Sequence, residues 1–591
     1  MRWALRHADE NAVHTLVSEL KVSPVVARLL AARNITQPAE AQKFLLPILS
    51  DLHSPYEMLG MKAAVDRLEV AIANKEPVLI YGDYDVDGTT AVVVLKTAIE
   101  ICGGVTQFHV PHRIKDGYGM KEDVIERAAE AGVRLIISVD TGIRAFAAAE
   151  TAKRVGVDLI VTDHHLPETQ EGVPHALAVL NPNQPGCSYP CKALCGAGVA
   201  FKVAQALLEL HGRDRLLPSF IKMVAIATIA DAVPLVGENR ILAKIGLKGL
   251  SDPRNIGLKA ILEISGVDTT KPITPGDIAF RVAPRLNAAG RMDVAEDVIN
   301  LFTTRDADEA RRLAQKLHDL NGDRQAEEAR ILEEIHKTLA DNPAMRDAYF
   351  IVVDGDGWHR GVIGITATRV VERYCRPAIV LSRDGDEAHG SGRSIRGFHL
   401  LEALESCREL FTRFGGHAAA VGLGLPCDRI SDLRAALDNF ARGRLTPEDF
   451  IPVLDYDADI SLSEVSSQLY DAVQQLQPFG MGNPEPVFAI SGASITLPPK
   501  IVKEKHLKLR LSQPTNGNRR SWQALAWRMA ERVAADPLVV GDSLDVAFTL
   551  EHNDHPDFGG LELRVCDFRR ACSAPLVTAE KEMPAVSGRQ A

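Results

Sequence analysis

The chain has 591 residues, of which 46% are hydrophobic and 25% are charged. This composition is typical of a soluble globular protein, and the length is too great for one core and predicts three or four domains. Its net charge of −11, from 67 basic and 78 acidic residues, argues against a nonspecific coat on nucleic acid but is compatible with a local basic channel. No run approaches the roughly 18 apolar residues of a membrane span, and no secretory signal is visible. Nine scattered cysteines fit a reducing compartment, so we expect a cytoplasmic protein.

Residues 1–60 are predicted to be helical and loop-rich, without a recognisable site. From about residue 77, short apolar runs alternate with amphipathic stretches. The order βαβα predicts a parallel sheet with right-handed crossovers, whose ligands bind beyond the carboxyl ends of its strands. The predicted strands are 78–81, 105–110, 134–139 and 158–161, and the predicted helices are 89–101, 121–132 and 143–155.

The turn after the first strand carries alternating carboxylates. Asp83, Asp85 and Asp87 precede Gly88, which permits a sharp turn before the helix. Clustered carboxylates repel one another, and a hard divalent cation with oxygen ligands relieves that repulsion. The alternative is an Asp-rich surface turn or helix cap.

Further acidic residues follow the next strands. Asp140 ends the third strand, and Asp163, His164 and His165 end the fourth. A later apolar segment, 223–230, ends on Asp231. We expect these groups to converge at one edge of the sheet and to form a metal site, although each aspartate alone is compatible with a cap and the histidines with half-buried core positions.

The order of these motifs resembles the DHH phosphoesterase superfamily. The match includes the Asp83-x-Asp85-x-Asp87-Gly turn, Asp140-Thr-Gly, Asp163-His-His and Ala230-Asp231. It is nearest to the RecJ family of single-strand-specific exonucleases and covers nearly the whole chain. Thr141 departs from the pattern, since many relatives carry Asn or Cys there.

This resemblance implies two metal ions, Mn²⁺ or Mg²⁺. Asp83, Asp85 and Asp140 would hold the first, and Asp87, Asp140, His164 and Asp231 the second, with Asp140 bridging. Two cations about 3.5–4 Å apart can activate a water and stabilise both oxygens of an in-line displacement. Asp163 is expected to orient a histidine or to cap, and His165 to contact the phosphate or brace the site.

Two further segments of the first half carry candidate substrate contacts. Arg113 follows the second strand and suits bidentate phosphate binding, although an exposed arginine is often only a surface ion pair. Residues 284–292 are predicted to form a loop with Arg285 and Arg291, which faces the substrate in the RecJ family; a plain interdomain turn is the alternative. Cys187, Cys191 and Cys195 lack the spacing of a zinc site, and residues 195–201 are interpreted as a close-packed turn into a helix.

A long amphipathic pattern over 306–339 predicts one or two helices that link two lobes. A second α/β domain begins near residue 349 and resembles the DHHA1 domain that accompanies DHH domains. Ser391 and Arg393 are candidates, with Arg113, for a pocket that holds the 5′ end of the strand. His417 is expected to close over the metal site and contact the scissile phosphate; a half-buried structural histidine is the alternative.

Beyond residue 450, short strands at 487–490, 495–497, 507–511, 522–527, 543–550 and 561–566 suggest a small closed, OB-like barrel. Between Lys500 and Arg528 there are eight basic residues and one acid. In proteins that bind single strands, basic side chains contact the backbone phosphates and aromatic side chains stack on the bases. The alternative for this segment is a basic surface that only keeps the protein soluble. The candidates are Lys503, Lys505, Lys508, Arg510, Trp522 and Trp527.

The predicted architecture is therefore two α/β lobes joined by a long helix, plus an OB-like barrel. The expected segments are a helical segment 1–60, a DHH catalytic domain 61–260, a helical connector 261–345, a DHHA1 domain 346–450, an OB-like domain 451–572 and a disordered tail 573–591.

The predicted function is a metal-dependent 5′–3′ exonuclease that hydrolyses single-stranded DNA to mononucleotides in repair and recombination; the polarity comes from the resemblance. The alternatives are a phosphodiesterase for short oligonucleotides or cyclic dinucleotides and an inactive scaffold at the replication fork. The expected partners are single-stranded DNA, single-strand-binding protein and a recombination helicase, with no membrane and a monomeric state. Metal preference, processivity, discrimination against RNA and the role of the three cysteines are not specified by the sequence.

Overall fold

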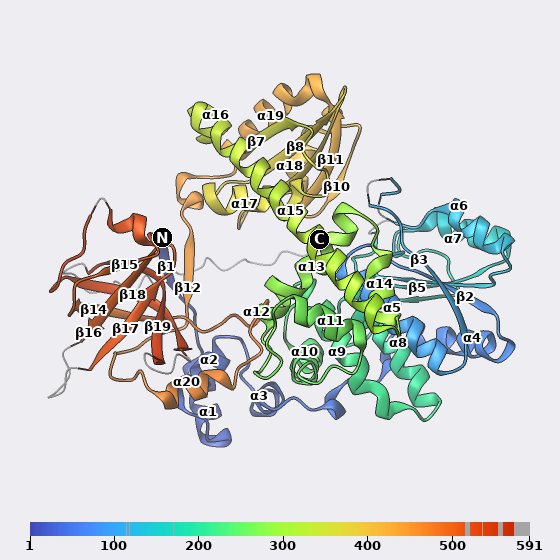
Figure 1. Cartoon of the computed structure of the whole chain (residues 1–591), viewed down its shortest axis with the longest axis horizontal. Helices are drawn as coiled ribbons and strands as arrows, with labels where there is room; N and C mark the ends of the chain where they lie inside the picture. The colour runs from blue at the N-terminus through green and yellow to red at the C-terminus, as the bar shows by residue number, and fades with distance from the viewer. Residues whose placement is uncertain are drawn as a thin grey trace, which may run out of the picture. The chain divides into compact units, whose positions relative to one another are not determined.

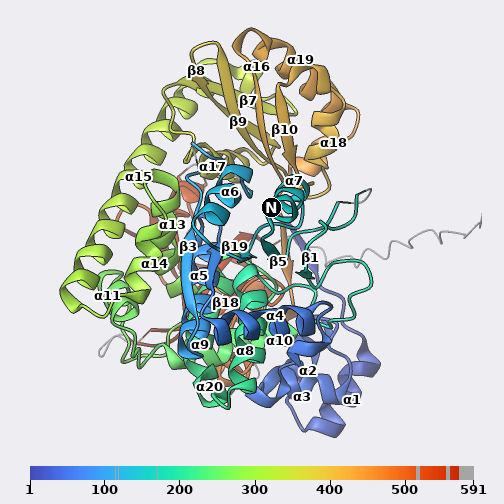
Figure 2. The same ribbon diagram turned by 90° about the vertical axis from the view of Figure 1, so that its right-hand side faces the viewer.

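The computed structural model describes residues 1–113, 115–117, 119–168, 171–513, 520–534, 536–553 and 559–571. They form two compact units, each assembled from separate segments. The larger unit comprises Gln42–Pro452 and Leu476–Pro484, and the smaller comprises Met1–Ala41, Val453–Gln475 and the residues from Glu485 onward. In the described part of the chain, no helix combines the length and apolar character that crossing a membrane requires. Figures 1 and 2 show the elements of both units.

The first lobe of the larger unit is built on a five-stranded parallel sheet of order β3-β2-β4-β5-β6. Each central strand is buried on both faces, which explains their continuous apolar runs. The chain moves from β2 to β3 on one side and then returns across β2 to β4, so a topological switch point lies between β2 and β4. The strands are β2 (Pro77–Tyr81), β3 (Val105–His109), β4 (Leu135–Val139), β5 (Asp158–Thr162) and β6 (Ala178–Leu180).

Helices cover both faces of this sheet. Leu79 and Tyr81 point into a core with α6 (Glu122–Glu130) and α7 (Phe146–Val155). Val78 and Ile80 point into the opposite, larger core. The helices on that side are α4 (Met61–Asn74), α5 (Val86–Ile101), α8 (Gly196–Leu210), α9 (Leu217–Ala230), α10 (Gly237–Gly249), α11 (Ile256–Ile264), α13 (Ala283–Met292) and α14 (Glu296–Thr303).

The predicted loop at 284–292 is wrong, because these residues form α13. Pro284 lies at the start of α13, directly after the π-helical turn Ile278–Val282, so the proline is accommodated where the hydrogen-bonding pattern of the helix changes. Gly290 is required by close packing, since a Cβ there would lie 2.1 Å from the carbonyl oxygen of Tyr84. The segment 223–230 is also helical, so Asp231 reaches the site from the end of α9 rather than from a strand.

One continuous helix, α15 (Ala307–Asp341), joins the two lobes of the larger unit, as Figure 2 shows. Its 35 residues span about 52 Å at 1.5 Å per residue. Leu313 and Leu317 pack into the core of the first lobe, whereas Ile331, Ile335 and Leu339 pack against the second. The predicted linking helix is thus confirmed as a single helix.

The second lobe has a five-stranded mixed sheet of order β10-β11-β9-β8-β7. Only β7 and β8 run parallel, and the remaining neighbours are antiparallel. Its elements are β7 (Ile351–Asp356), α17 (Ile363–Tyr374), β8 (Ala378–Asp384), β9 (Glu387–Arg393), α18 (Leu400–Glu405), β10 (Arg413–Gly416), β11 (Ala420–Pro426) and α19 (Ile430–Arg442).

The smaller unit contains a closed five-stranded barrel. Strand β14 pairs with β18 on one side and with β16 on the other, and β17 pairs in parallel with β19. The two strands predicted at 487–490 and 495–497 are one strand with an irregularity between Ile490 and Ala493. The barrel strands are β14 (Phe488–Ile495), β16 (His506–Ser512), β17 (Ser521–Ala526), β18 (Ser543–Asn553) and β19 (Gly560–Arg570). The short strand β15 (Lys500–Val502) pairs with β16 beside the barrel.

The prediction that 1–60 is only helical and loop-rich is wrong at its start. Strand β1 (Arg2–Leu5) pairs in parallel with β12 (Val453–Tyr456), and α1 (Glu10–Leu20) and α2 (Pro24–Ala31) belong to the same unit as the barrel. The partner strand lies about 450 residues away, so no local pattern indicates the pairing. The predicted tail at 573–591 lies outside the described residues.

Candidate metal centre and substrate cavities

The turn after β2 brings the first carboxylates together at the switch point. Asp85 caps α5, since the Gly88 N–H donates to its Oδ1 at 3.0 Å. The Val86 N–H donates to Asn287 Oδ1 at 3.1 Å, which ties the turn to α13. A Cβ on Gly88 would lie 2.6–2.7 Å from atoms of Asp83. Glycine at this position therefore allows the turn to fold tightly enough to bury Asp83.

Asp140 follows β4 in the left-handed backbone region, with φ of 59°. Its side chain is almost fully buried and packs against the start of α8. A Cβ on Gly196 would lie 2.4 Å from Asp140 Oδ1. The N–H groups of Gly196 and Ala197 donate to the two oxygens of Asp87, at 2.6 and 2.8 Å. The glycine-rich start of α8, predicted as a close-packed turn into a helix, thus positions two carboxylates.

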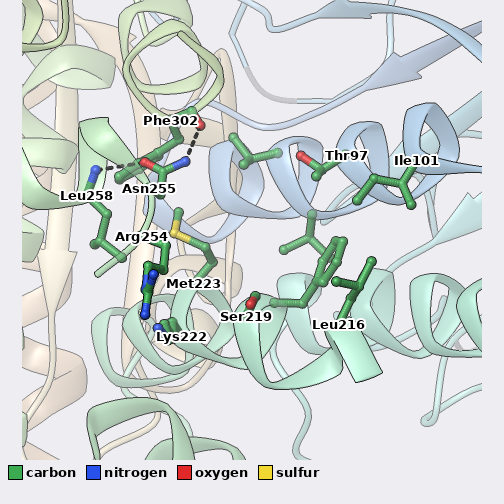
Figure 3. A pocket seen from close by; sticks show the side chains of 13 residues that line it. Thr97, Ile101, Leu216, Ser219, Lys222, Met223, Arg254, Asn255, Leu258 and Phe302 are labelled. Atoms are coloured by element: carbon green, nitrogen blue, oxygen red, sulfur yellow. Dashed lines mark hydrogen bonds between the residues drawn. The ribbon is translucent and has the colours of Figure 1, made fainter. Parts of the chain in front are cut away.

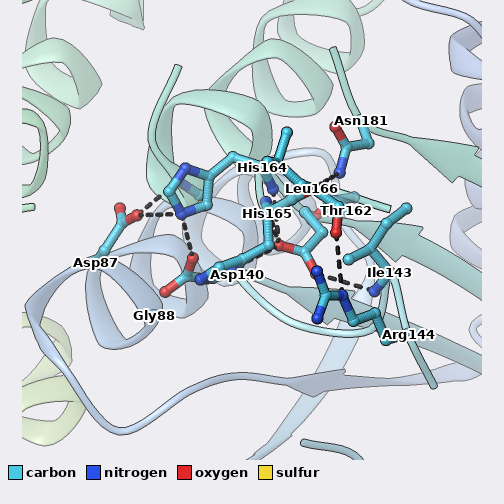
Figure 4. Close-up of polar contacts among 12 residues, drawn as sticks. Asp87, Gly88, Asp140, Ile143, Arg144, Thr162, His164, His165, Leu166 and Asn181 are labelled. Atoms are coloured by element: carbon cyan, nitrogen blue, oxygen red, sulfur yellow. Dashed lines mark hydrogen bonds and ion pairs between the residues drawn. The ribbon is translucent and has the colours of Figure 1, made fainter. Parts of the chain in front are cut away.

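The histidine pair, His164 and His165 (Figure 4), is held by Asp163. Its Oδ1 accepts hydrogen bonds from the backbone N–H groups of His164 and His165 and lies 2.8 Å from His165 Nδ1. Its Oδ2 accepts from the Ile143 N–H at 2.9 Å. Asp163 therefore orients the histidines from behind the cluster, as the sequence analysis expected.

His164 lies among three carboxylates. Its Nε2 is 3.3 Å from Asp140 Oδ1 and 3.9 Å from both Asp87 Oδ2 and Asp231 Oδ2. Among the described residues, three groups of side chains have ligand atoms close enough to share one cation. They are Asp83, Asp85 and Asp140; Asp87, His164 and Asp231; and Asp140, His164 and His165.

The electrostatics of the cluster favour a cation. Burial raises the pKa of Asp83 and Asp140 well above the ordinary value, and neighbouring carboxylates raise both further. Burial and the charges of Asp87 and Asp85 raise the pKa of Asp231 to about 9. Asp83 Oδ1 and Asp140 Oδ1 are buried and accept no hydrogen bond from the described residues, and the ring nitrogen 3.3 Å from Asp140 Oδ1 is His164 Nε2, itself a candidate metal ligand. Because buried polar atoms are normally paired, these oxygens fit a divalent cation with oxygen ligands.

Asp163 and His165, which lie behind the cluster, stabilise each other's charge, whereas the carboxylates of the cluster repel one another. Burial alone would raise the pKa of Asp163, but hydrogen bonding and charge from His165 keep it below its ordinary value. Burial also opposes the charged form of His165, yet Asp163 raises the pKa of this imidazole to about 9. His165 therefore offers a positively charged donor beside the carboxylate cluster.

A cationic cavity of about 580 Å³ lies between the two lobes of the larger unit. It is lined by Arg113, Arg291, Ser391 and Arg393, among others. Arg393 Nη1 donates to Ser391 Oγ at 3.1 Å, and Arg113 lies over the ring of Tyr84 at 4.9 Å. Residues far apart in the sequence, predicted to hold the end of a strand, thus share one cavity.

A second cavity, of about 500 Å³, is lined by His165, Arg144 and His417. His417 follows β10 of the second lobe, whereas the other two residues belong to the first. Burial lowers the pKa of His417, and the charges of Arg144 and His165 lower it further. The structure thus places His417 across a cavity from the residues beside the cluster.

A third cavity, of about 390 Å³, contains residues that the sequence analysis missed. Its lining includes Asn287, which holds the Asp turn, and Ala230, which precedes Asp231. It also includes Phe280, which is 81% exposed on a π-helical turn, Ile278–Val282. Such turns are frequent at functional sites. No sequence signal distinguishes this phenylalanine from a core residue.

An apolar cavity of about 180 Å³ lies apart from the carboxylate cluster, between α5 and α9 (Figure 3). Met223, Leu258 and Phe302 contribute to its lining. Asn255 at its edge donates to the Phe302 carbonyl oxygen and accepts from the Leu258 N–H, so this polar side chain is satisfied. This apolar cavity contributes no ligand to the metal centre.

Some predicted residues are placed elsewhere. Arg285 donates to the carbonyl oxygen of Arg281 and to His318 on α15, so its guanidinium ties two helices together. Cys187, Cys191 and Cys195 are free thiols. Among the groups of possible metal ligands in the described residues, none includes a cysteine.

The barrel candidates lie on or beside β16 and β17. Trp527 is 48% exposed and contacts His506 edge-to-face. Trp522 is half-buried, and its indole N–H donates to the Leu462 carbonyl oxygen at 3.0 Å. Lys508 and Arg510 lie on β16, whereas Lys503 and Lys505 lie in the turn before it.

Comparison with known proteins gives consistent matches along the chain. Family models match at 77–228 (DHH family, N-terminal domain), 347–443 (DHHA1 domain) and 456–567 (RecJ OB domain). The single-stranded-DNA-specific exonuclease RecJ of Escherichia coli is 33% identical, over 95% of this chain and 94% of the relative. The protein of that name from Bacillus subtilis is 40% identical, over 86% of this chain but only 64% of the relative.

Among solved structures, the crystal structure of RecJ in complex with Mn²⁺ from Thermus thermophilus matches with a TM-score of 0.82 at 28% identity. The match covers 97% of this chain and 80% of that one. The predicted combination of two α/β lobes and an OB barrel is thereby confirmed.

Proposed function

The chain belongs to the RecJ family of single-stranded-DNA-specific exonucleases, and we propose that it hydrolyses single-stranded DNA stepwise from the 5′ end to mononucleotides, in DNA repair and recombination. The observation that carries this proposal is the cluster of five carboxylates and His164 at the switch point of the first lobe. Two of its buried oxygens accept no hydrogen bond from the described residues. A cluster of this kind supports metal-assisted phosphodiester hydrolysis.

Two divalent cations, Mn²⁺ or Mg²⁺, fit the donor set. Asp83, Asp85 and Asp140 would hold one, and Asp87, Asp140, His164 and Asp231 the other. When bound, the cations supply charge stabilisation and activate water for an in-line displacement. Oxygen ligands suit magnesium, and the added imidazole suits manganese.

The protein's own residues orient the ligands and the substrate. Asp163 holds the imidazole ring of His165 and the backbone N–H of His164, and the first N–H groups of α8 hold Asp87. His165 and His417 would approach the scissile phosphate from the cavity that they share. Arg113, Ser391 and Arg393 would bind the 5′-phosphate, since guanidinium groups bind phosphate bidentately. Binding of the 5′-phosphate in the cationic cavity would place the first phosphodiester bond at the carboxylate cluster, which would account for 5′–3′ polarity and for release of one nucleotide at a time.

Phe280 would support a nucleobase next to the metal centre. Base–aromatic stacking contributes about 1–3 kcal/mol per base, so Phe280→Ala is expected to raise KM for single-stranded DNA about tenfold with little change in kcat. Phe280→Trp is expected to restore KM. Steady-state digestion of a labelled oligonucleotide measures both values. Tyr56→Ala removes an aromatic that is 49% exposed elsewhere in the same unit and serves as the control; equal KM values for Phe280→Ala and this control would exclude a stacking role.

The barrel would guide the rest of the strand. Trp527 offers an exposed face for stacking, and Lys503, Lys505, Lys508 and Arg510 provide charges for backbone phosphates. Single-strand-binding protein and a recombination helicase are the proposed protein partners. We also propose a cytoplasmic location and a monomeric state.

Digestion of end-labelled oligonucleotides with Mn²⁺ or Mg²⁺ tests the proposed function. We expect mononucleotides released stepwise from the 5′ end of single strands, no attack on blunt duplex, and no digestion in EDTA. Binding without cleavage in either metal would instead indicate a scaffold. Cleavage confined to strands of two to five nucleotides would indicate a short-oligonucleotide phosphodiesterase.

A further inference from the structure

The cationic cavity holds more positive charge than one phosphate requires. Five guanidinium groups line it, together with His389. A terminal monophosphate carries only about −1.5 to −2 charges at neutral pH. Among the residues that the structure describes, none of the five arginines forms an ion pair with a carboxylate; they are Arg113, Arg291, Arg360, Arg393 and Arg413.

These side chains form two groups within the one cavity. Burial lowers the pKa of Arg291 to about 10 and also lowers that of Arg393, and for both Arg113 is the largest neighbouring charge. Burial likewise lowers the pKa of Arg360, and the charge of Arg413 lowers it further, while the carboxylates of Asp384 and Glu387 partly offset this shift. The contacts define the same two groups. In the inner group, with Arg113, Arg393 Nη1 donates to Ser391 Oγ at 3.1 Å and Arg291 Nη1 donates to the Gly361 carbonyl oxygen at 3.0 Å. In the outer group, with Arg360, Arg413 Nη2 lies 3.4 Å from His389 Nδ1.

His389 belongs to the outer group. After burial, the charges of Arg360 and Arg413 are the next causes that lower its pKa, and its Nδ1 lies 3.4 Å from Arg413 Nη2. The exposed carboxylate of Glu387 lies 3.8 Å from its Nε2. His389 and Ser391 are two residues apart on β9, so their side chains lie on the same face of the strand, about 7 Å apart. The outer group thus continues the phosphate site formed by Ser391 and Arg393.

The start of α17 completes the wall of the cavity. A Cβ on Gly364 would lie 3.1 Å from Ser391 Oγ and 3.3 Å from Arg393 Nη2, and a Cβ on Gly361 would lie 2.4 Å from the Arg291 carbonyl oxygen. The N-terminus of a helix also favours anions. The volume of about 580 Å³ lies in the range of sites for small molecules, roughly 300–1,000 Å³, rather than that of a single ion.

We infer that the outer group is a subsite for the terminal phosphates of a 5′-triphosphorylated strand, so that the protein also degrades strands with this end. The inference rests on the proposed function, with the first phosphate bound by the inner group. In the first turnover, the oxygen of water bonds to the phosphorus of the second nucleotide. The bond from that phosphorus to O3′ of the first nucleotide breaks, and O3′ takes a proton. The products are a nucleoside 5′-triphosphate and a shortened strand with a 5′-monophosphate.

The test uses full-length protein with Mn²⁺ and one oligonucleotide sequence carrying a 5′-hydroxyl, 5′-monophosphate or 5′-triphosphate. We expect wild type to digest the triphosphorylated strand at least as efficiently as the monophosphorylated one, with a nucleoside triphosphate as first product by chromatography. Arg360→Ala and Arg413→Ala should each lower kcat/KM for the triphosphate about tenfold more than for the monophosphate, since each removes a charge-assisted phosphate contact. Arg393→Ala should lower kcat/KM by the same factor for the triphosphorylated and the monophosphorylated strand.

Arg429→Ala is the matched control, because Arg429 is exposed in the same lobe and pairs with Asp432; it should leave all values unchanged. Resistance of the triphosphorylated strand in wild type, with normal digestion of the monophosphate, would overturn the inference. If Arg360→Ala and Arg413→Ala each lowered kcat/KM equally for the 5′-triphosphorylated and the 5′-monophosphorylated strand, the inference would also be overturned, since these arginines would then bind the DNA backbone. Failure of wild type on every strand would instead refute the proposed function.

Discussion

Asp140→Asn is expected to lower kcat for single-stranded DNA by roughly 10³-fold or more, because this carboxylate is shared by two of the groups that can hold a cation and each cation supplies several kcal/mol to the transition state. Asparagine is the appropriate replacement, since the backbone there has φ of 59° and asparagine adopts this conformation more readily than most residues. Single-turnover digestion in excess Mn²⁺ measures the loss.

The same variant separates the loss of a ligand from misfolding. A buried carboxylate whose pKa is raised in the folded state destabilises the protein at pH above its unfolded pKa, and this destabilisation is relieved as pH falls. Burial and neighbouring carboxylates raise the pKa of Asp140 in this way. In EDTA at pH 7, Asp140→Asn should therefore melt at a higher temperature than wild type, and wild type should itself gain stability towards pH 5. Added Mn²⁺ should raise the Tm of wild type more than that of the variant. A variant that retains activity, or whose Tm rises in Mn²⁺ as much as that of wild type, would contradict a ligand role. A variant that melts below wild type in EDTA would instead indicate misfolding.

Gly196→Ala is expected to lower kcat by about 100-fold although it changes no ligand. A Cβ at this position would lie 2.4 Å from Asp140 Oδ1 and 2.5 Å from Asp140 Cβ, so either the carboxylate or the start of α8 must shift. That helix start also donates two hydrogen bonds to Asp87. A displacement of about 1 Å in a catalytic group can cost 10²-fold in rate. Rate constants at saturating DNA and a titration of Mn²⁺ measure the effect.

Gly198→Ala is the matched control, two residues further along α8. A Cβ there would meet the flexible end of Leu194 at 3.2 Å, a contact that a small side-chain movement relieves. We expect near-wild-type rates for this variant and weaker Mn²⁺ binding for Gly196→Ala. Similar rates for the two variants would show that the packing of Gly196 against Asp140 does not control the geometry of the cluster.

The metal centre was largely predictable because it follows a rule of topology. Carboxylates at the ends of parallel strands meet at one edge, so Asp83, Asp140 and Asp163 were recognisable from local pattern alone. Asp231 was assigned through motif order, since it is delivered by a helix end rather than a strand. Phe280 and Asn287 were missed because their roles depend on which helix surfaces meet in the fold.

The errors in the fold have a common physical cause. Pro284 and Gly290 suggest a loop when they are considered locally, yet one occupies a first helical turn and the other permits contact with the Tyr84 carbonyl. Gly492, with φ of 68°, suggests a break between two strands but lies within β14. In each case tertiary contacts outweigh the local preference of a glycine or proline.

The pairing of β1 with β12 has a consequence for synthesis on the ribosome. Residues 2–5 pair with residues 453–456, so the first strand emerges long before its neighbour exists. At about 5–20 residues per second, this interval lasts roughly 20–90 s. During this interval β1 has no partner strand, and it is available to chaperones or to another nascent chain. By the end of the interval both lobes of the larger unit are complete enough to fold. The residues from Val453 onward thus complete the unit that residues 1–41 belong to.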